Sequence, residues 1–245
     1  DHPEGEAVDN GLALNVKDVP WAERQMWAPD ATEKDGKYYL FFPAKDFDGI
    51  FRIGVATSDS PIGPFVAESK AIKESFSIDP AVFKDSDGSY YMYFGGIWGG
   101  QLQRWRTVVF ISENPGSPLA HLPNDNEPAL CAKVAKLTED LLELAEAPKD
   151  IVVVDEHGNP LLQGDTEKRF FEASWMHKYD GKYYFSYSTG DTHLICYATG
   201  DNPYGPFKYA GKILNPVVGW TSHHSIVEFD GEWYLFYHDS SLSKG

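Results

Sequence analysis

The phrase Asp35-Gly-Lys-Tyr-Tyr-Leu-Phe-Phe42 recurs three more times along the chain. Its other copies are Asp87-Gly-Ser-Tyr-Tyr-Met-Tyr-Phe94, Asp180-Gly-Lys-Tyr-Tyr-Phe-Ser-Tyr187 and Asp230-Gly-Glu-Trp-Tyr-Leu-Phe-Tyr237. Asp-Gly is the strongest short signal for a two-residue β-hairpin turn, and aromatic runs are typical of strands. The repetition predicts a protein built from copies of one antiparallel β unit.

The spacing of the copies predicts the architecture. Successive Asp-Gly turns lie 52, 93 and 50 residues apart, and a second repeat follows two of them, at 53–65 and 195–207. Four strands at a period of about fifty residues are typical of a β-propeller blade. A sandwich of unrelated strands would explain neither the period nor the repeated wording. We therefore predict an all-β fold, a five-bladed β-propeller whose first blade and C-terminal closing strands are incomplete in this chain.

The long middle interval indicates an insertion at about 101–168 within one domain spanning 1–245. Inside it, the segment 128–148 has apolar residues at helical spacing. The same segment is also compatible with a strand at Lys133–Leu137, a polar turn and a further strand at Ile151–Val154. Periodicity alone does not decide between them, and the logic of the repeat favours the strands.

One position in the repeat carries chemistry. Eight residues before the Asp of the first three turns stand Trp27, Asp79 and Glu172, and seven before the fourth stands His223. If the units are arranged radially, these four side chains converge on one axis. A carboxylate among apolar neighbours is costly to bury, and burial raises its pKa, which suits a proton donor near neutrality. Either carboxylate could instead cap a neighbouring strand.

The remaining candidates are aromatic or imidazole side chains. Flat apolar faces suit the C–H faces of sugar rings, so Trp27, Trp98 and Trp175 are candidate sugar-binding residues. Trp220 also lies near the end of a predicted inner strand. Plain core packing is the alternative for each tryptophan. His224 stands beside His223 and is a further candidate for substrate binding.

Composition narrows the function classes. The 245 residues carry a net charge of −16, which repels phosphate backbones and argues against a nucleic-acid partner, whereas a neutral or cationic ligand is compatible with it. No apolar run approaches a membrane span, and the N-terminus does not resemble a signal peptide. Cys131 and Cys196 form no metal-binding or disulfide pattern. The sequence leaves compartment and oligomeric state open.

Four motifs in order carry a family resemblance: Trp27-Ala-Pro-Asp, Ile78-Asp-Pro-Ala-Val-Phe, the strand around Glu172, and His223-His-Ser-Ile-Val. Together they resemble glycoside hydrolase family 43, a family of five-bladed β-propellers. The wording of 94–105 and 185–193 is similar to its β-xylosidase/α-L-arabinofuranosidase branch.

The resemblance implies roles for individual residues. Glu172 matches the general acid, and Asp79 matches the carboxylate that tunes the pKa of the acid and orients the substrate. His223 matches the central histidine that approaches a calcium ion through water, and Trp27 matches the wall of the sugar pocket. The general base of the family lies in an Asp-Pro segment of the first blade. No such segment precedes Trp27, so the base is not found among residues 1–245.

We therefore expect an exo-acting, inverting hydrolase that releases terminal xylose or arabinofuranose from small hemicellulose oligosaccharides, with calcium in the central channel. Inversion needs acid and base carboxyls about 6.5–9.5 Å apart. Two alternatives remain: a non-catalytic sugar-binding propeller, which the missing base suggests, and a structural propeller whose axial residues hold a cation.

Overall fold

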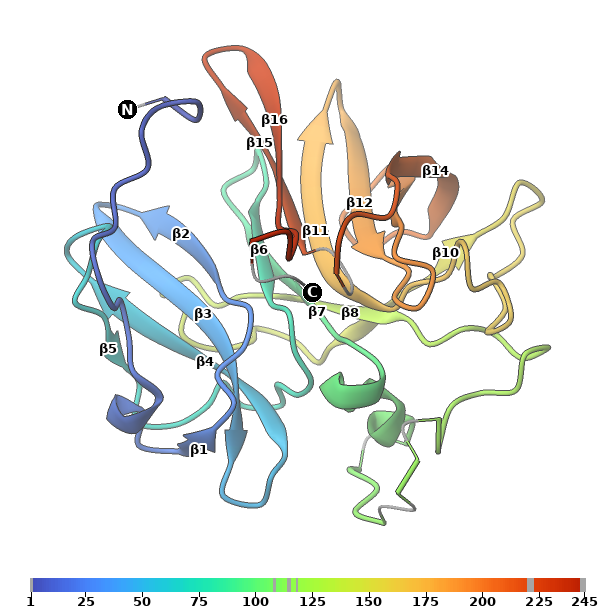
Figure 1. Cartoon of the computed structure of the whole chain (residues 1–245), viewed down its shortest axis with the longest axis horizontal. Helices are drawn as coiled ribbons and strands as arrows, with labels where there is room; N and C mark the ends of the chain where they lie inside the picture. The colour runs from blue at the N-terminus through green and yellow to red at the C-terminus, as the bar shows by residue number, and fades with distance from the viewer. Residues whose placement is uncertain (1, 108, 114–115, 118, 220–222, 243–245) are drawn as a thin grey trace.

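The computed structural model of the chain describes residues 2–107, 109–113, 116–117, 119–219 and 223–242. Within these ranges the fold is all-β, as predicted: three sheets of four or five strands and a two-stranded hairpin, with short 3₁₀ helices between them (Figure 1). The predicted positions of the repeat phrases fall in the hairpins of these sheets. Among the described residues no helix is both long and apolar enough to cross a membrane.

The first sheet follows a short 3₁₀ helix, η1 (Val16–Asp18). It has the order β1-β3-β4-β5, with β2 also paired to β3. The strands are β1 (Ala22–Arg24), β2 (Asp30–Lys34), β3 (Lys37–Asp46), β4 (Phe51–Ser58) and β5 (Val66–Ala67).

The second sheet has the order β6-β7-β8-β9 and takes two strands from the long middle interval of the sequence. Two 3₁₀ helices, η2 (Trp98–Gly100) and η3 (Leu102–Trp105), follow its second strand. Strands β8 and β9 confirm the strand interpretation of 128–154, and the helical alternative is wrong. The helical spacing was misleading because Leu137, Leu141 and Leu144 come from the turn that follows β8, and they pack into one cluster without forming a helix. The strands are β6 (Ala81–Lys84), β7 (Tyr90–Phe94), β8 (Ala132–Lys136) and β9 (Lys149–Ile151).

The third sheet runs β10-β14-β13-β12-β11, and β10 lies parallel to β14 at its outer edge. Its strands are β10 (Val153–Val154), β11 (Glu172–Tyr179), β12 (Lys182–Ser188), β13 (Ile195–Gly200) and β14 (Phe207–Leu214). The chain ends with the hairpin β15 (His224–Phe229) and β16 (Glu232–Tyr237). The second repeat phrase therefore covers the third strand of its unit, β4 or β13, and ends where the fourth strand, β5 or β14, begins, as predicted.

Three of the four Asp-Gly turns have the predicted geometry. Both turn residues have positive φ at 35–36, 180–181 and 230–231, as a two-residue type I′ turn requires. The second turn differs: β6 stops at Lys84, β7 starts at Tyr90, and within the turn only Gly88 has positive φ. The longer loop is closed by two backbone hydrogen bonds, from Asp85 N–H to the Ser89 carbonyl and from Gly88 N–H to the Asp85 carbonyl.

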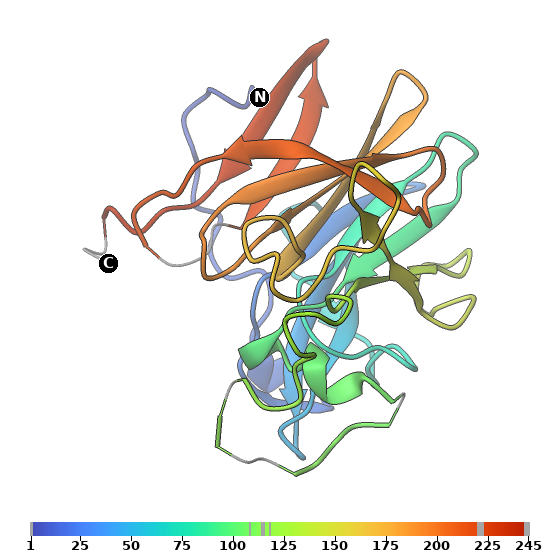
Figure 2. The ribbon, with the colours of Figure 1, turned by 90° about the vertical axis from the view of Figure 1, so that its right-hand side faces the viewer.

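The core lies between consecutive sheets. One cluster joins β7 and β8 to β12 and β13, and another joins β3 and β4 to β7. Because β7 is packed on both faces, all five of its residues are buried and the usual alternation of buried and exposed residues is lost. The first strands of the four repeat units are β2, β6, β11 and β15, and each contacts the next, β2 with β6, β6 with β11, and β11 with β15 (Figures 1 and 2).

A polar cluster ties the second sheet to the third. The buried carboxylate of Asp85 accepts hydrogen bonds from Lys178 Nζ at 2.7 Å and from the Tyr183 hydroxyl at 2.5 Å. Burial raises the pKa of Asp85, but the hydrogen bonds from Lys178 and Tyr183 outweigh it and hold the pKa below its ordinary value. The carboxylate therefore stabilises the fold above its ordinary pKa, and this contribution is lost as the pH falls through the lowered value.

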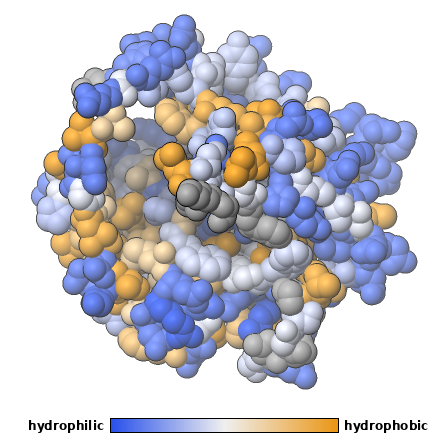
Figure 3. All heavy atoms as spheres, in the orientation of Figure 1, coloured by the Kyte–Doolittle hydropathy of each residue, from blue (hydrophilic) through white to orange (hydrophobic). Residues whose placement is uncertain are grey.

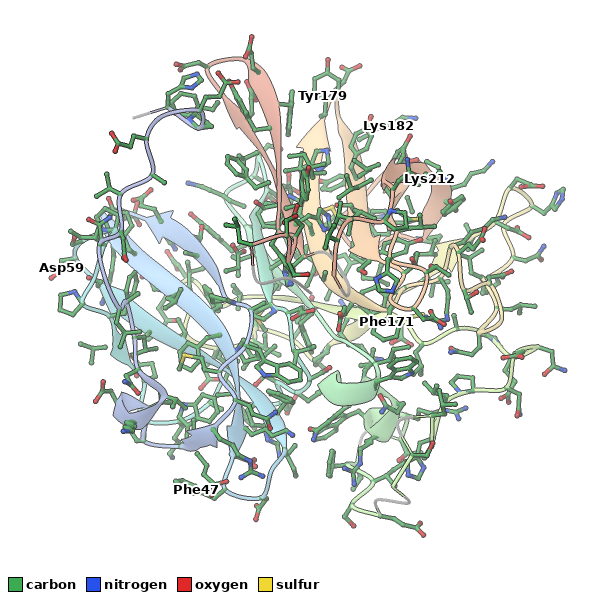
Figure 4. The ribbon with its side chains drawn as sticks, in the orientation of Figure 1. Phe47, Asp59, Phe171, Tyr179, Lys182 and Lys212 are labelled. Carbon is green, nitrogen blue, oxygen red and sulfur yellow. The ribbon has the colours of Figure 1, made fainter. Side chains whose placement is uncertain are left out.

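We expect Asp85→Asn to lower the thermal midpoint by about 3–6 °C at pH 7, because the amide cannot accept from both donors as strongly. The difference from the wild type should shrink as the pH falls below 4. Asp59→Asn is the matched control, since Asp59 is exposed at the edge of the first sheet (Figure 4). Equal midpoints for the two variants would contradict the role of Asp85.

Candidate active site

All four side chains at the predicted repeat position line one cavity of about 570 Å³. Trp27 precedes β2, Asp79 precedes β6, Glu172 begins β11 and His223 precedes β15. They meet because the first strands of the four units lie side by side and start at the same end of the molecule. Figure 4 marks this end by Phe171 beside the η2 turn, with Tyr179 at the opposite end of β11. The prediction that these residues converge is confirmed.

Asp79 is the most enclosed polar group of the cavity, with 4% of its surface exposed. Its Oδ2 accepts a hydrogen bond from the backbone N–H of Ala173 at 2.9 Å, across the gap between the second and third sheets. Burial raises the pKa of Asp79 to about 7, and the hydrogen bond opposes this only in part. Asp79 also has a positive φ of 57°, a strained conformation that is found at functional sites more often than elsewhere.

Glu172 is half-buried and pairs with Ser188 at the start of β11. Gly96 packs against it: a Cβ at Gly96 would stand 3.2 Å from the Glu172 Cβ and 2.7 Å from the side chain of Ile78. Ile78 immediately precedes Asp79, so this glycine lets the backbones bearing the two carboxyl groups approach each other.

His223 Nδ1 lies 3.9 Å from Asp79 Oδ2, and 29% of its side chain is exposed. Burial lowers the pKa of His223 to about 4, against an opposing effect of the Glu172 carboxylate and with a further lowering from His238. The imidazole is therefore neutral at pH 7. His238, which also lines the cavity, accepts a hydrogen bond from the His223 backbone N–H at 3.2 Å.

Aromatic rings form the walls. The Trp27 ring, 38% exposed, packs on Phe51 with 4.6 Å between ring centroids. Across the cavity, Trp98 meets Phe171 edge-on at 5.1 Å. The surface view shows a hollow beside the first sheet with apolar residues in its walls (Figure 3). Both tryptophans predicted at this end therefore line the cavity.

Two residues predicted to bind substrate lie outside the cavity lining. Trp175 instead donates from its indole Nε1 to the carbonyl of Ile226 at 3.0 Å, which links β11 to β15. His224 is buried, with Nε2 placed 2.7 Å from the hydroxyl of Ser186, because neighbouring residues of a strand point to opposite faces. Burial lowers the pKa of His224 to about 3. Trp220 lies outside the described residues.

The sequence analysis also missed two residues, His238 and Asp30. Asp30 Oδ2 accepts from the backbone N–H of Val82 at 2.7 Å, which links β2 to β6. Burial raises the pKa of Asp30 to about 6. Asp30 and Trp175 hold the same position in the repeat, three residues after Trp27 and Glu172, and both reach the next inner strand. Comparing the repeats at this second position would have revealed a linking site rather than a sugar-binding one.

Two carboxyl groups at one end of a repeated all-β scaffold, between aromatic walls, can protonate a glycosidic oxygen while holding a sugar ring. Fold and cavity together define the class as an all-β glycosidase.

Comparison with known proteins agrees with this class. The sequence profile of the glycosyl hydrolases family 43 matches residues 9–245. The chain is 62% identical to a xylosidase/arabinosidase of Bacteroides ovatus over 98% of its own length and 72% of that protein. It is 59% identical to xylosidase/arabinosidase 43A of Humicola insolens, over 99% of its length and 75% of the relative.

Solved structures are equally similar. One is a family 43 β-xylosidase/α-arabinofuranosidase from a compost microbial metagenome, in complex with xylotriose and in a calcium-free form, with 66% identity and a TM-score of 0.94 over 98% of this chain and 72% of that one. Another is a family 43 enzyme of Xanthomonas citri complexed with xylose, with 56% identity and a TM-score of 0.94 over 100% of this chain and 72% of that one. The chain belongs to glycoside hydrolase family 43, and it is a glycosidase of the xylosidase/arabinofuranosidase branch.

Proposed function

We propose that the protein is an exo-acting, inverting hydrolase that releases terminal xylose or arabinofuranose from small oligosaccharides. The observation that carries this proposal is the meeting of Asp79 and Glu172 between the walls of Trp27 and Trp98 in one cavity. The similar proteins support the substrate class, since two of them were crystallised with xylotriose or xylose. Xylose and arabinofuranose have similar outlines, so one pocket can accept both.

In this proposal Glu172 is the general acid and donates its proton to the leaving oxygen. Asp79 keeps that proton on Glu172 by electrostatic repulsion when ionised, and its fixed position orients the sugar. Trp27 and Trp98 hold the faces of the terminal sugar ring. The general base is a carboxylate about 6.5–9.5 Å from Glu172, with room for the attacking water. Among the described residues, Asp79 and Glu172 are the acidic residues that line the cavity, which leaves no third carboxylate among them to act as the base.

The sheets fit a five-bladed β-propeller, which extends the all-β description. Three sheets and a hairpin follow one another in sequence. The first strands of the four repeat units, β2, β6, β11 and β15, contact each other in turn. Radial packing of that kind places the starts of the inner strands around one axis. The single domain over 1–245 is part of this proposal.

The family resemblance also implies a calcium ion in the central channel. One similar structure is named as a calcium-free form, but calcium prefers several oxygen ligands, and no three acidic, histidine or cysteine side chains gather into a metal site among the described residues. A neutral imidazole at His223 does not supply that donor set. The residues do not fit a calcium ion held directly by the protein, and our mechanism has no step through it. Contact of His223 with a hydrated ion stays a prediction.

The stereochemistry of the product tests the proposed mechanism. On xylotriose we expect ¹H NMR to detect α-xylose first, before mutarotation, because inversion of a β-linkage releases the α-anomer. Release of p-nitrophenol from the β-xyloside and the α-L-arabinofuranoside measures the sugar preference. First appearance of β-xylose would contradict inversion. Binding of xylotriose without any turnover would favour a non-catalytic sugar-binding protein.

A further inference from the structure

A second hollow adjoins the catalytic cavity. It measures about 280 Å³ and shares Trp98 and Gly99 with that cavity, so the two are separated by one turn of chain. The turn is η2, which lies with η3 beside the end of the first sheet (Figures 1 and 2). Gln101 holds it there, since its side-chain oxygen accepts from the Phe51 N–H at 2.9 Å and its amide donates to the Gly49 carbonyl at 3.0 Å.

The two hollows differ in charge. The acidic residues Asp79 and Glu172 line the catalytic cavity. Lys45 and Arg104 line the second hollow, with Glu113 as the acidic residue among its described lining. A basic hollow stands out in a chain of net charge −16.

Lys45 lies near two other basic residues, Arg24 and Arg104, and Arg24 is paired with the adjacent Glu23. Lys45 on β3 is registered directly opposite Arg24 on β1, and like charges across a strand pair are destabilising. Arg104 bonds to the backbone carbonyls of Ile111 and Ser112, each at 2.7 Å, which fixes its guanidinium but leaves its positive charge. Burial lowers the pKa of Lys45, and the charges of Arg24 and Arg104 lower it further. A bound anion would relieve this repulsion.

The hollow also presents a polar atom that needs a partner. Gln103 is 4% exposed, and its amide nitrogen donates to the Trp98 carbonyl at 3.0 Å. Within the part of the chain that the structure describes, its Oε1 is buried and accepts no hydrogen bond. An unpaired buried carbonyl is costly, and a ligand hydroxyl would satisfy it. The wall thus combines an acceptor for a sugar hydroxyl with a cation.

We propose that the second hollow receives the leaving-group end of the substrate, and that Lys45 selects oligosaccharides that carry a carboxylate there. The inference rests on the proposed function, because it places the terminal sugar in the catalytic cavity and the rest of the substrate in the hollow that shares Trp98 with it. Two sources could supply the carboxylate: an oxidised, aldonic-acid end or a glucuronic acid branch.

A matched ligand pair tests the proposal. Xylobionate and xylobiitol differ only in an end carboxylate against an end alcohol. Their dissociation constants can be measured by calorimetry in the Glu172→Gln protein, whose slowed turnover leaves the ligands largely intact during a titration. We expect xylobionate to bind about fivefold more tightly at low salt, with the preference fading at about 1 M salt. A glucuronate-branched xylotriose against plain xylotriose forms the second arm, and the larger ratio identifies the source.

Lys45→Met should abolish the preference for the carboxylate ligand in both pairs. The methionine side chain can keep the packing on the Phe51 ring, whose centroid lies 5.0 Å from the Lys45 ammonium in the native chain. Lys208→Met, an exposed change on β14, is the matched control and should keep the preference for the carboxylate ligand. Equal affinities within both ligand pairs, or a preference that survives Lys45→Met, would overturn the inference alone. If neither xylobiitol nor xylotriose binds, the proposed function fails and the inference fails with it.

Discussion

Glu172→Gln is expected to lower kcat on p-nitrophenyl β-xyloside and on xylotriose by about 10³-fold without unfolding the protein. The amide keeps the size of the carboxyl group and its place at the start of β11, but it carries no proton to give to the leaving oxygen. The loss should be larger for xylotriose, because a sugar is a poorer leaving group than p-nitrophenolate and depends more on protonation.

Two comparisons make this result specific. Xylosyl fluoride needs no acid, so its hydrolysis should fall much less in Glu172→Gln than that of xylotriose. Glu228→Gln, an exposed change on β15, is the matched control and should retain full activity. If Glu172→Gln lost activity equally on all three substrates, we would assign Glu172 to binding rather than to proton donation.

Asp79→Asn is expected to reduce kcat/KM by at least about 10²-fold while making the protein more stable above pH 7. The asparagine oxygen can still accept the hydrogen bond from Ala173, so the link between the sheets is kept. The negative charge is lost, and with it the repulsion that holds the proton on Glu172. The alkaline limb of the pH profile for the remaining activity should therefore move to lower pH.

The stability change follows from the pKa of Asp79. The folded-state value of about 7 lies above the ordinary 3.8, so between these values the folded protein holds a proton that the unfolded chain has released. Stability from this group is therefore fully present below pH 3.8 and falls as the pH rises to about 7. Removing the charge should raise the free energy of unfolding at pH 8 by on the order of a few kcal/mol.

Denaturant titrations at pH 4.5 and pH 8 measure this contribution, with Asp59→Asn as the exposed control. The variant and the wild type should differ clearly at pH 8 and only slightly at pH 4.5. A variant that is less stable than the wild type at both values would mean that the Asp79 carboxylate stabilises the fold, contrary to our account.

The sequence predicted the all-β fold and the convergence of four side chains on one cavity from the same observation. The repeated turn fixes where each inner strand ends, so counting back from it locates Trp27, Asp79, Glu172 and His223 without any knowledge of packing. Trp175 and His224 were chosen by residue type instead. Their side chains form links between sheets and are not part of the cavity lining, and their contact with substrate stays a prediction.

The basic hollow could not be predicted in the same way. Arg24, Lys45 and Arg104 come from two different strands and a 3₁₀ helix, and no shared repeat position connects them. Their proximity depends on how β1 pairs with β3 and on where η3 packs against the first sheet. His238 was missed for a related reason. It directly follows the last repeat phrase, where the earlier copies carry Pro43, Gly95 and Ser188, so no shared chemistry marks the position.

The hydrogen bond from Ala173 to Asp79 crosses between the second and third sheets, so the geometry of the cavity depends on how these two sheets pack against each other. Of the two carboxyl groups that we propose for catalysis, Asp79 precedes the second sheet and Glu172 begins the third, so neither sheet holds a complete site. A small rotation between the sheets would separate the two groups before the strands themselves lost their pairing. On heating, the catalytic rate should therefore decline at a lower temperature than the circular-dichroism signal of the β-strands.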